Sequence, residues 1–143
     1  TLYVSDTGDF KESGFIFAVN PSGEIDLLFE GNDLIKAPNG VLVLDDSKLL
    51  IVDWAGDLLE GDLQSQDIKK LGEGFEGADG LAIKQDTIYI SSWIKGTIYS
   101  FKNGKTKVIA DGFEAAADIA LVHDNKFLVV PDMKAGTVTF IGI

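Results

Sequence analysis

The chain has 143 residues, of which 45% are hydrophobic and 24% are charged, which is not the composition of a disordered segment. Its formal net charge of −11 makes nucleic acid an unfavourable partner, because a phosphate backbone repels an acidic surface. The sequence has no cysteine, which excludes disulfides and thiolate chemistry within it, and no apolar run approaches the roughly 18 residues of a membrane span. The acidic surface can concentrate cations, although solubility alone also explains it.

The chain opens directly on a predicted strand, TLYVSD at 1–6, and the same pattern recurs three times. Leu, β-branched or aromatic residues followed by a polar stop return in LLIVDW at 49–54, TIYISS at 87–92 and FLVVPD at 127–132. No signal-peptide-like start precedes the first copy. A chain that begins inside an element leads us to expect a natural N-terminus further upstream.

Two further families of predicted strands keep the same spacing. One family is led by glycines at intervals of 42, 40 and 40 residues, namely Gly14, Gly56, Gly96 and Gly136. The other comprises PNGVLVL at 38–44, ADGLAIK at 78–84 and ADIALVH at 117–123. The polar residues that open this family, Asn39, Asp79 and Asp118, lie 40 and 39 residues apart. Four strands in a repeat of about 40 residues are typical of β-propeller blades.

Turns and apolar runs complete the all-β pattern. Asn103-Gly104 is a hairpin signal, because both central residues of such a tight turn favour positive φ. The inner strands at 41–44, 81–83 and 119–122 are nearly all apolar, which predicts strands buried on both faces between neighbouring blades. No stretch shows sustained helical periodicity.

We therefore predict about three and a half blades of four antiparallel strands, belonging to a six-bladed propeller. The expected divisions are an incomplete blade at 1–37, full blades at 38–77 and 78–116, and an incomplete closing blade at 117–143. Such an arc would expose sheet edges and a flat apolar blade face. The expected partners are therefore the remaining blades, supplied by a longer parent chain or by another copy.

The repeat also resembles a known family. The segments SGFIFAVNPSGEIDLLFEGNDLIKAPNGVLVLDD at 13–46, GADGLAIKQDTIYISSW at 77–93 and the closing LVVPDMKAGTVTFIGI are similar to the gluconolactonase and senescence-marker-protein (regucalcin-like) propellers. The resemblance covers essentially the whole chain, and strictosidine-synthase-like and NHL-type propellers share much of the pattern. The resemblance, together with the absence of cysteine, suggests an extracytoplasmic location.

The resemblance implies a site at one mouth of the propeller channel. Asn39 and Asp79 match positions that bind a divalent cation, commonly Ca²⁺, and Asp79 also matches a general base that activates water against a lactone or ester. The family's other ligands would lie upstream of Thr1. The role of Asp118, on the next blade, is not assigned by the resemblance.

Physical chemistry agrees with this assignment but leaves an alternative. Ca²⁺ takes carboxylate, amide and water oxygens, and equivalent strands of successive blades point at one axis, so Asn39, Asp79 and Asp118 can converge. Asn and Asp also occupy turns before strands simply because they bond local N–H groups. The glycines that follow, Gly40 and Gly80, either keep space clear near the axis or supply backbone freedom.

Further residues of the sequence are candidates for the same mouth of the channel. We assign Asp118, Trp54 and Trp93 as candidate substrate-binding residues, although a Trp at such a place more often packs between blades. Asp6, Asp53 and Asp132 close equivalent strands, where capping is the commoner role. His123, the single histidine, falls in a predicted turn, and no nucleophile elbow accompanies it.

Two functions follow from this pattern. The first is a metal-dependent lactonase or esterase acting on a small molecule. The second is a non-catalytic propeller that binds a ligand or a protein, because the fold hosts both classes. Acidic or Asn residues converging on Asn39 and Asp79 from an upstream blade would favour the enzyme.

Overall fold

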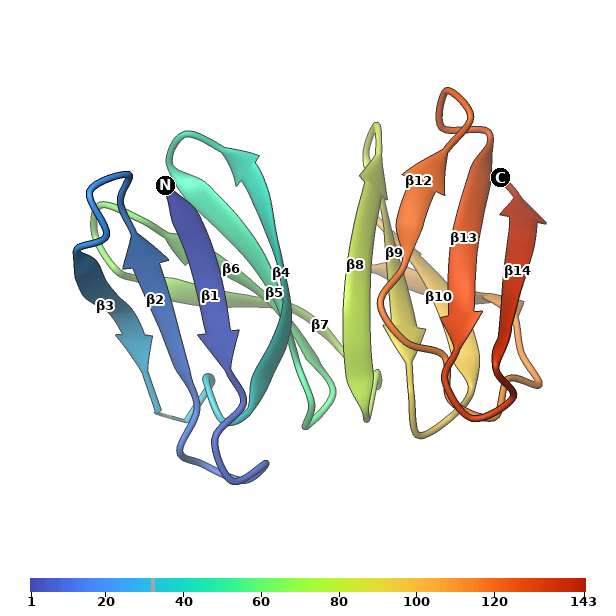
Figure 1. The fold of residues 1–143 in the computed structure, drawn as a ribbon, viewed down its shortest axis with the longest axis horizontal. Coiled ribbons are helices and arrows are strands. Elements are labelled where there is room, and N and C mark those ends of the chain that lie inside the picture. The colour runs from blue at the N-terminus through green and yellow to red at the C-terminus, as the bar shows by residue number, and fades with distance from the viewer. Residues whose placement is uncertain (32) are drawn as a thin grey trace.

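The computed structural model describes residues 1–31 and 33–143, and these residues form fourteen strands and no helix. Accordingly, the described part of the chain has no helix able to span a membrane. Asn32, which belongs to the segment 13–46 that carries the family resemblance, lies outside the described residues. All strand pairs are antiparallel, and the strands form four separate sheets that follow one another across the molecule in chain order (Figure 1).

Each sheet is a simple meander whose strands pair in the order of the sequence. The first sheet contains β1 (Leu2–Asp6), β2 (Phe15–Val19) and β3 (Ile25–Glu30). The second contains β4 (Pro38–Asp45), β5 (Lys48–Asp53), β6 (Asp57–Asp62) and β7 (Ile68–Glu73). The third contains β8 (Ala78–Lys84), β9 (Thr87–Ser92), β10 (Thr97–Lys102) and β11 (Lys105–Ala110). The fourth contains β12 (Ala120–Val122), β13 (Phe127–Asp132) and β14 (Thr137–Gly142).

This architecture confirms the predicted blades of a partial propeller. The innermost strands of successive sheets contact one another, β1 with β4, β4 with β8, and β8 with β12. The predicted Asn103-Gly104 turn is also confirmed, with φ values of 51° and 73° between the paired residues Lys102 and Lys105. Positive φ at both positions matches the right-handed twist of the two strands it joins.

Three apolar cores lie between the four sheets. Alternate residues of β5 show how a blade is buried on both faces, since Leu49 and Ile51 enter the core shared with the first sheet. Leu50 and Val52 enter the core shared with the third sheet. A third core, containing Ile98 and Leu128, joins the third and fourth sheets. Side chains in a strand point to opposite faces in turn, so each central blade contributes to two cores.

The prediction that all three inner strands are buried on both faces is correct only for β8. Val43 and Leu44 at the end of β4 are exposed, and β12 begins with exposed Ala120. The difference lies in the neighbours, because β8 has an inner strand on each side. By contrast, the first sheet begins with β1, which occupies the place of β5 and β9 in the repeat, so β4 has no equivalent strand on that side. No described sheet follows that of β12. An apolar run indicates that a strand can be buried, but the strand is buried only where a neighbouring blade covers it.

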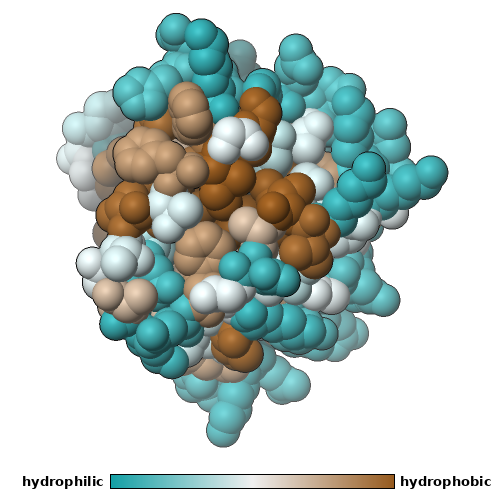
Figure 2. All heavy atoms as spheres, turned by 90° about the vertical axis from the view of Figure 1, so that its right-hand side faces the viewer, coloured by the Kyte–Doolittle hydropathy of each residue, from teal (hydrophilic) through white to brown (hydrophobic). Residues whose placement is uncertain are grey.

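The outward faces of the first and last sheets carry exposed apolar side chains. On the first sheet these are Leu2, Val4, Ile25 and Leu27. On the last sheet they are Phe127, Val138 and Phe140. Figure 2 shows that apolar residues gather on the face at this end of the molecule. Since β1 and β3 both pair with β2, and β13 pairs with β14, each set forms one patch.

Candidate functional site

The three predicted strand-opening residues meet in one pocket. Asn39 and Asp79 are the second residues of β4 and β8, and Asp118 stands two residues before β12. All three line a pocket of about 310 Å³ together with Gly40, Val41, Leu81 and Ile119. The sequence spacing of 40 and 39 residues therefore corresponds to convergence in space.

A β-bulge opens each of the two complete inner strands at this pocket. Pro38 pairs with Asp53 and Val41 with Ile51, so β4 carries one extra residue between them. The same shift occurs on β8, between Ala78 and Leu81. Because a bulge leaves a residue out of the ladder and re-aims side chains, Asn39 and Asp79 are placed by equivalent irregularities.

Gly40 and Gly80 allow the inner strands to approach closely. A Cβ at Gly40 would lie 2.5 Å from the carbonyl oxygen of Asp79. A Cβ at Gly80 would lie 2.4 Å from the carboxylate oxygen Oδ1 of Asp118 and 2.6 Å from its Cα. Neither glycine has positive φ. The structure therefore favours the explanation that a side chain would not fit at these positions over the explanation that the backbone needs a conformation reserved for glycine.

Side chains of β9 and of β1 with the residues after it fix the backbone beneath the pocket. Ser91 Oγ on β9 accepts a hydrogen bond from the Gly80 N–H at 2.9 Å. Ser5 Oγ on β1 donates to the carbonyl oxygen of Asn39 at 2.5 Å, and Thr7 Oγ1 donates to that of Pro38 at 3.1 Å. The first three sheets therefore hold the chain around the first two predicted ligands.

The charged state of both carboxylates in the pocket is destabilised. Burial raises the pKa of Asp79 above its ordinary value, and the negative charge of Asp118 raises it further. Partial burial also raises the pKa of Asp118, although a hydrogen bond from the Ile119 N–H opposes this. Among the residues that the structure describes, no Lys, Arg or His forms an ion pair with either carboxylate. A cation bound in the pocket would stabilise the charged forms of both carboxylates.

The donor set suits a hard cation but is small. Two carboxylates and one amide provide oxygen atoms of the kind that Ca²⁺ and Mg²⁺ prefer. Within residues 1–31 and 33–143, no group of three or more His, Cys, Asp or Glu side chains is placed to hold a metal ion. Asn39, Asp79 and Asp118 therefore fit part of a coordination shell, with water or further protein oxygens needed to complete it.

The aspartates that close the second strands have a different role from Asp79 and Asp118. Asp53 is buried, and its Oδ2 accepts hydrogen bonds from the N–H groups of Lys36 and Ala37 at 2.9 and 2.8 Å. Asp132 repeats this in the last sheet, accepting from Glu114 and Ala115. These carboxylates cap backbone N–H groups, as expected, and Asp6 does the same for Gly8.

The two predicted tryptophans lie against each other. Two further side chains, which the sequence did not indicate, extend the pair into a row. The ring centroids of Trp54 and Trp93 are 5.9 Å apart, and Phe10 meets Trp54 edge-on at 5.4 Å. The ammonium of Lys134 lies 4.2 Å from the centroid of the Trp93 ring. Phe10 lies three residues beyond the position equivalent to Trp54, and Lys134 lies one beyond, so the repeat gave no signal for either.

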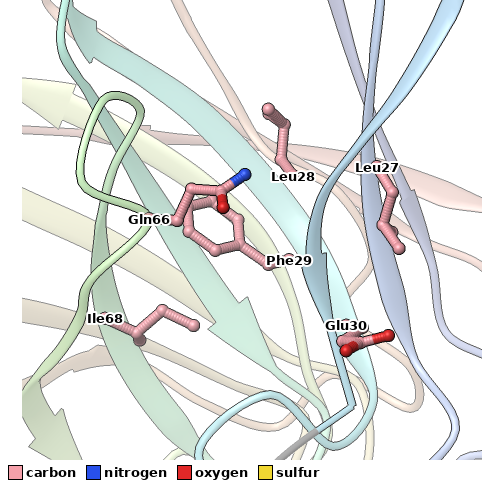
Figure 3. Close-up of a pocket in the computed structure, with 6 residues that line it drawn as sticks. All are labelled: Leu27, Leu28, Phe29, Glu30, Gln66 and Ile68. Carbon is pink, nitrogen blue, oxygen red and sulfur yellow. The ribbon is translucent and has the colours of Figure 1, made fainter.

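The remaining polar candidate and a second pocket lie elsewhere. His123 follows β12 at the end opposite Asp118 and is exposed, with its ring 6.0 Å from that of Phe127. The second pocket, of about 250 Å³, lies at the outer strands β3 and β7 (Figure 3). Its lining is Leu27, Leu28, Phe29, Glu30, Gln66 and Ile68, which offers a single ionisable side chain.

Comparison with known proteins identifies the fold. No family model matches the sequence, and no curated protein matches it. Among solved structures, the calcium-binding protein regucalcin from Agrobacterium tumefaciens strain C58 superposes with a TM-score of 0.74 at 19% identity. The match covers 99% of this chain and 57% of that one. The fold is that of a β-propeller.

Two further solved structures are similar over most of the chain. A chain in a nidogen/laminin complex superposes with a TM-score of 0.80 at 15% identity, covering 98% of this chain and 55% of that one. The computationally designed Ika4 protein superposes with a TM-score of 0.60 at 14% identity, covering 90% and 85%. This propeller chain thus spans little more than half the length of the two natural proteins. At these identities the likeness concerns the fold.

Proposed function

We propose that the pocket of Asn39, Asp79 and Asp118 binds a divalent cation, for which Ca²⁺ is the best match, and hydrolyses a lactone or ester there. One observation carries the proposal. Two carboxylates whose pKa values are raised share a pocket with an amide, and no cationic side chain of the described residues pairs with them.

Each residue has a defined task in this proposal. Asn39 and Asp79 supply oxygen ligands, and Asp118 supplies a further carboxylate at the same pocket. When bound, a divalent cation supplies Lewis acidity, which polarises a carbonyl oxygen and lowers the pKa of coordinated water. Asp79 accepts a proton from the attacking water.

The likeness to regucalcin supports the proposed cation. That protein is described as calcium-binding, and its fold matches nearly the whole of this chain. The family resemblance of the sequence adds the lactone or ester. Further ligands from blades outside this chain would complete the coordination shell.

A propeller that binds without catalysis is the second candidate. It is favoured by the small donor set and by the ring contacts of Phe10, Trp54 and Trp93 at the same end of the sheets. The similar fold of a chain in a nidogen/laminin complex is consistent with a propeller that works by contact with another protein.

Hydrolysis separates the two candidates. Initial rates on D-glucono-δ-lactone and phenyl acetate would be measured with Ca²⁺ and after chelation, for the wild type and for Asp79→Asn. We expect rates above background that fall at least about a hundredfold in Asp79→Asn, as for loss of a general base. Asp46→Asn is the matched control, because this exposed carboxylate lies in the turn at the opposite end of β4. Calcium binding without hydrolysis of any ester or lactone would favour the second candidate.

A further inference from the structure

Four consecutive sheets each contribute one side chain to a continuous row, which we call the aromatic row. Its members follow β1, β5, β9 and β13, and they are Phe10, Trp54, Trp93 and Lys134. Successive ring centroids are 5.4 and 5.9 Å apart, and the Lys134 ammonium lies 4.2 Å from the last ring.

The backbone holds the two tryptophans in fixed positions. The Trp54 N–H donates to the carbonyl oxygen of Ala37 at 2.8 Å, and the Trp93 N–H donates to that of Gly77 at 2.7 Å. The Gly77 N–H in turn donates to the carbonyl oxygen of Trp54 at 2.8 Å, which links the two blades directly. A surface whose rings are positioned before binding loses little conformational entropy when a ligand arrives.

The aromatic row lies at the same end of the sheets as the pocket. Asp53, the residue before Trp54, pairs across the ladder with Pro38, the residue before Asn39. On the third sheet, Ser92 before Trp93 pairs with Ala78 before Asp79. In each complete blade, a tryptophan and a pocket residue therefore occupy the adjacent ends of neighbouring strands.

The rings of the aromatic row are not fully buried by packing within the protein. None of its rings belongs to the three apolar cores, and both tryptophans are only partly buried. Phe10 is 56% exposed, and two further apolar side chains of the same loops, Ile94 and Met133, are 56% and 68% exposed. Exposed apolar side chains gathered beside polar groups are typical of ligand sites.

We propose that the aromatic row binds the apolar, planar part of a neutral substrate, so that the preferred substrate is an aromatic or cyclic apolar lactone or ester. Aromatic rings attract flat apolar groups but cannot satisfy a substrate's many hydroxyl groups, which disfavours a polyhydroxylated lactone. The net charge of −11 disfavours an anionic substrate. The ester or lactone part of this inference rests on the proposed function, whereas the apolar binding site does not.

Intrinsic fluorescence gives a direct test, because the only two tryptophans of the sequence are both in the aromatic row. The full chain carrying Asp79→Asn, which keeps hydrolysis from consuming the ligand, would be titrated with γ-phenyl-γ-butyrolactone and with D-glucono-δ-lactone. We expect a saturable change with the aromatic lactone at a concentration at least about tenfold lower than with the sugar lactone.

A pair of phenylalanine variants supplies the control. Phe10→Ala should weaken binding of the aromatic lactone about fivefold. Phe140→Ala should leave it unchanged, because Phe140 has the same 56% exposure but lies on β14. No saturable change, equal responses to both lactones, or equal effects of the two variants would overturn the inference. Saturable binding to Asp79→Asn, together with a wild type that hydrolyses neither lactone, would uphold this site and contradict the proposed hydrolase.

Discussion

Aspartates at the ends of neighbouring strands are used in two ways in this protein. Asp53 and Asp132 direct their carboxylates at backbone N–H groups and are buried. Asp79 and Asp118 line a pocket, where burial raises the pKa of both and no cationic side chain of the described residues forms an ion pair with them. The capping aspartates and the pocket aspartates cannot be told apart from the sequence, because each lies next to an apolar strand.

The capping role of Asp132 predicts a specific dependence of stability on pH. Burial acts to raise the pKa of Asp132, but N–H donors, including those of Ala135, Glu114 and Ala115, outweigh it and lower the pKa below 3.8. A carboxyl whose pKa is lower when folded stabilises the fold above its unfolded pKa, and this contribution is lost as the pH falls through the folded pKa.

Urea unfolding of the wild type and Asp132→Asn between pH 7 and pH 3 tests this linkage. We expect the free energy of unfolding to fall less steeply in the variant below about pH 4. Asp124→Asn, in an exposed turn, is the control and should keep the wild-type slope. Parallel curves for wild type and Asp132→Asn would contradict the role given to this carboxylate.

The strands and their order could be predicted from the sequence, because each blade repeats its own apolar alternation and turn residues. The convergence of Asn39, Asp79 and Asp118 was predictable for the same reason. The exposure of β4 and β12 was not, since it depends on which blades stand beside them. Phe10 and Lys134 were missed because they lie in loops that the repeat does not constrain.

The close packing of the inner strands predicts that replacing Gly80 by a residue with a side chain destabilises the fold. In Gly80→Ala the new methyl would meet the backbone of Asp118 and Ile119 at 2.6 Å, which a side-chain rotation cannot relieve. We expect a loss of about 1–3 kcal/mol in the free energy of unfolding, measured by urea denaturation.

Gly142→Ala is the matched control for this packing. Nothing lies within 4 Å of a Cβ at Gly142, and its φ is not positive. The change in stability should stay within about 0.5 kcal/mol. Equal effects of the two substitutions would contradict the close approach of β8 to the last sheet.

At the scale of the whole molecule, the outward faces of the first and last sheets expose apolar side chains that interior blades bury. The last sheet does so at Val138 and Phe140. We propose that further blades, from a longer parent chain or from another copy, cover these faces. The chain's span of 57% and 55% of two natural propeller structures is consistent with this proposal.

Uncovered faces predict association of this chain when it is studied alone. Sedimentation velocity over a hundredfold range of concentration should show an average mass that rises with concentration. The double variant Val138→Lys and Phe140→Lys should shift the onset of association to higher concentration. Val108→Lys, at an exposed position on β11, should not. A chain that stays monomeric throughout would contradict the proposed need for covering blades.

In the function that we propose, Asn39 and Asp79 hold a divalent cation at the mouth of the propeller channel. Titration calorimetry with Ca²⁺ on the full chain, beside Asn39→Ala, Asp79→Ala and the distant control Asp46→Asn, tests it most directly. We expect one calcium site whose affinity falls at least about tenfold in each of the first two variants and is unchanged in the third. Absent binding, or binding equally strong in all four proteins, would contradict it.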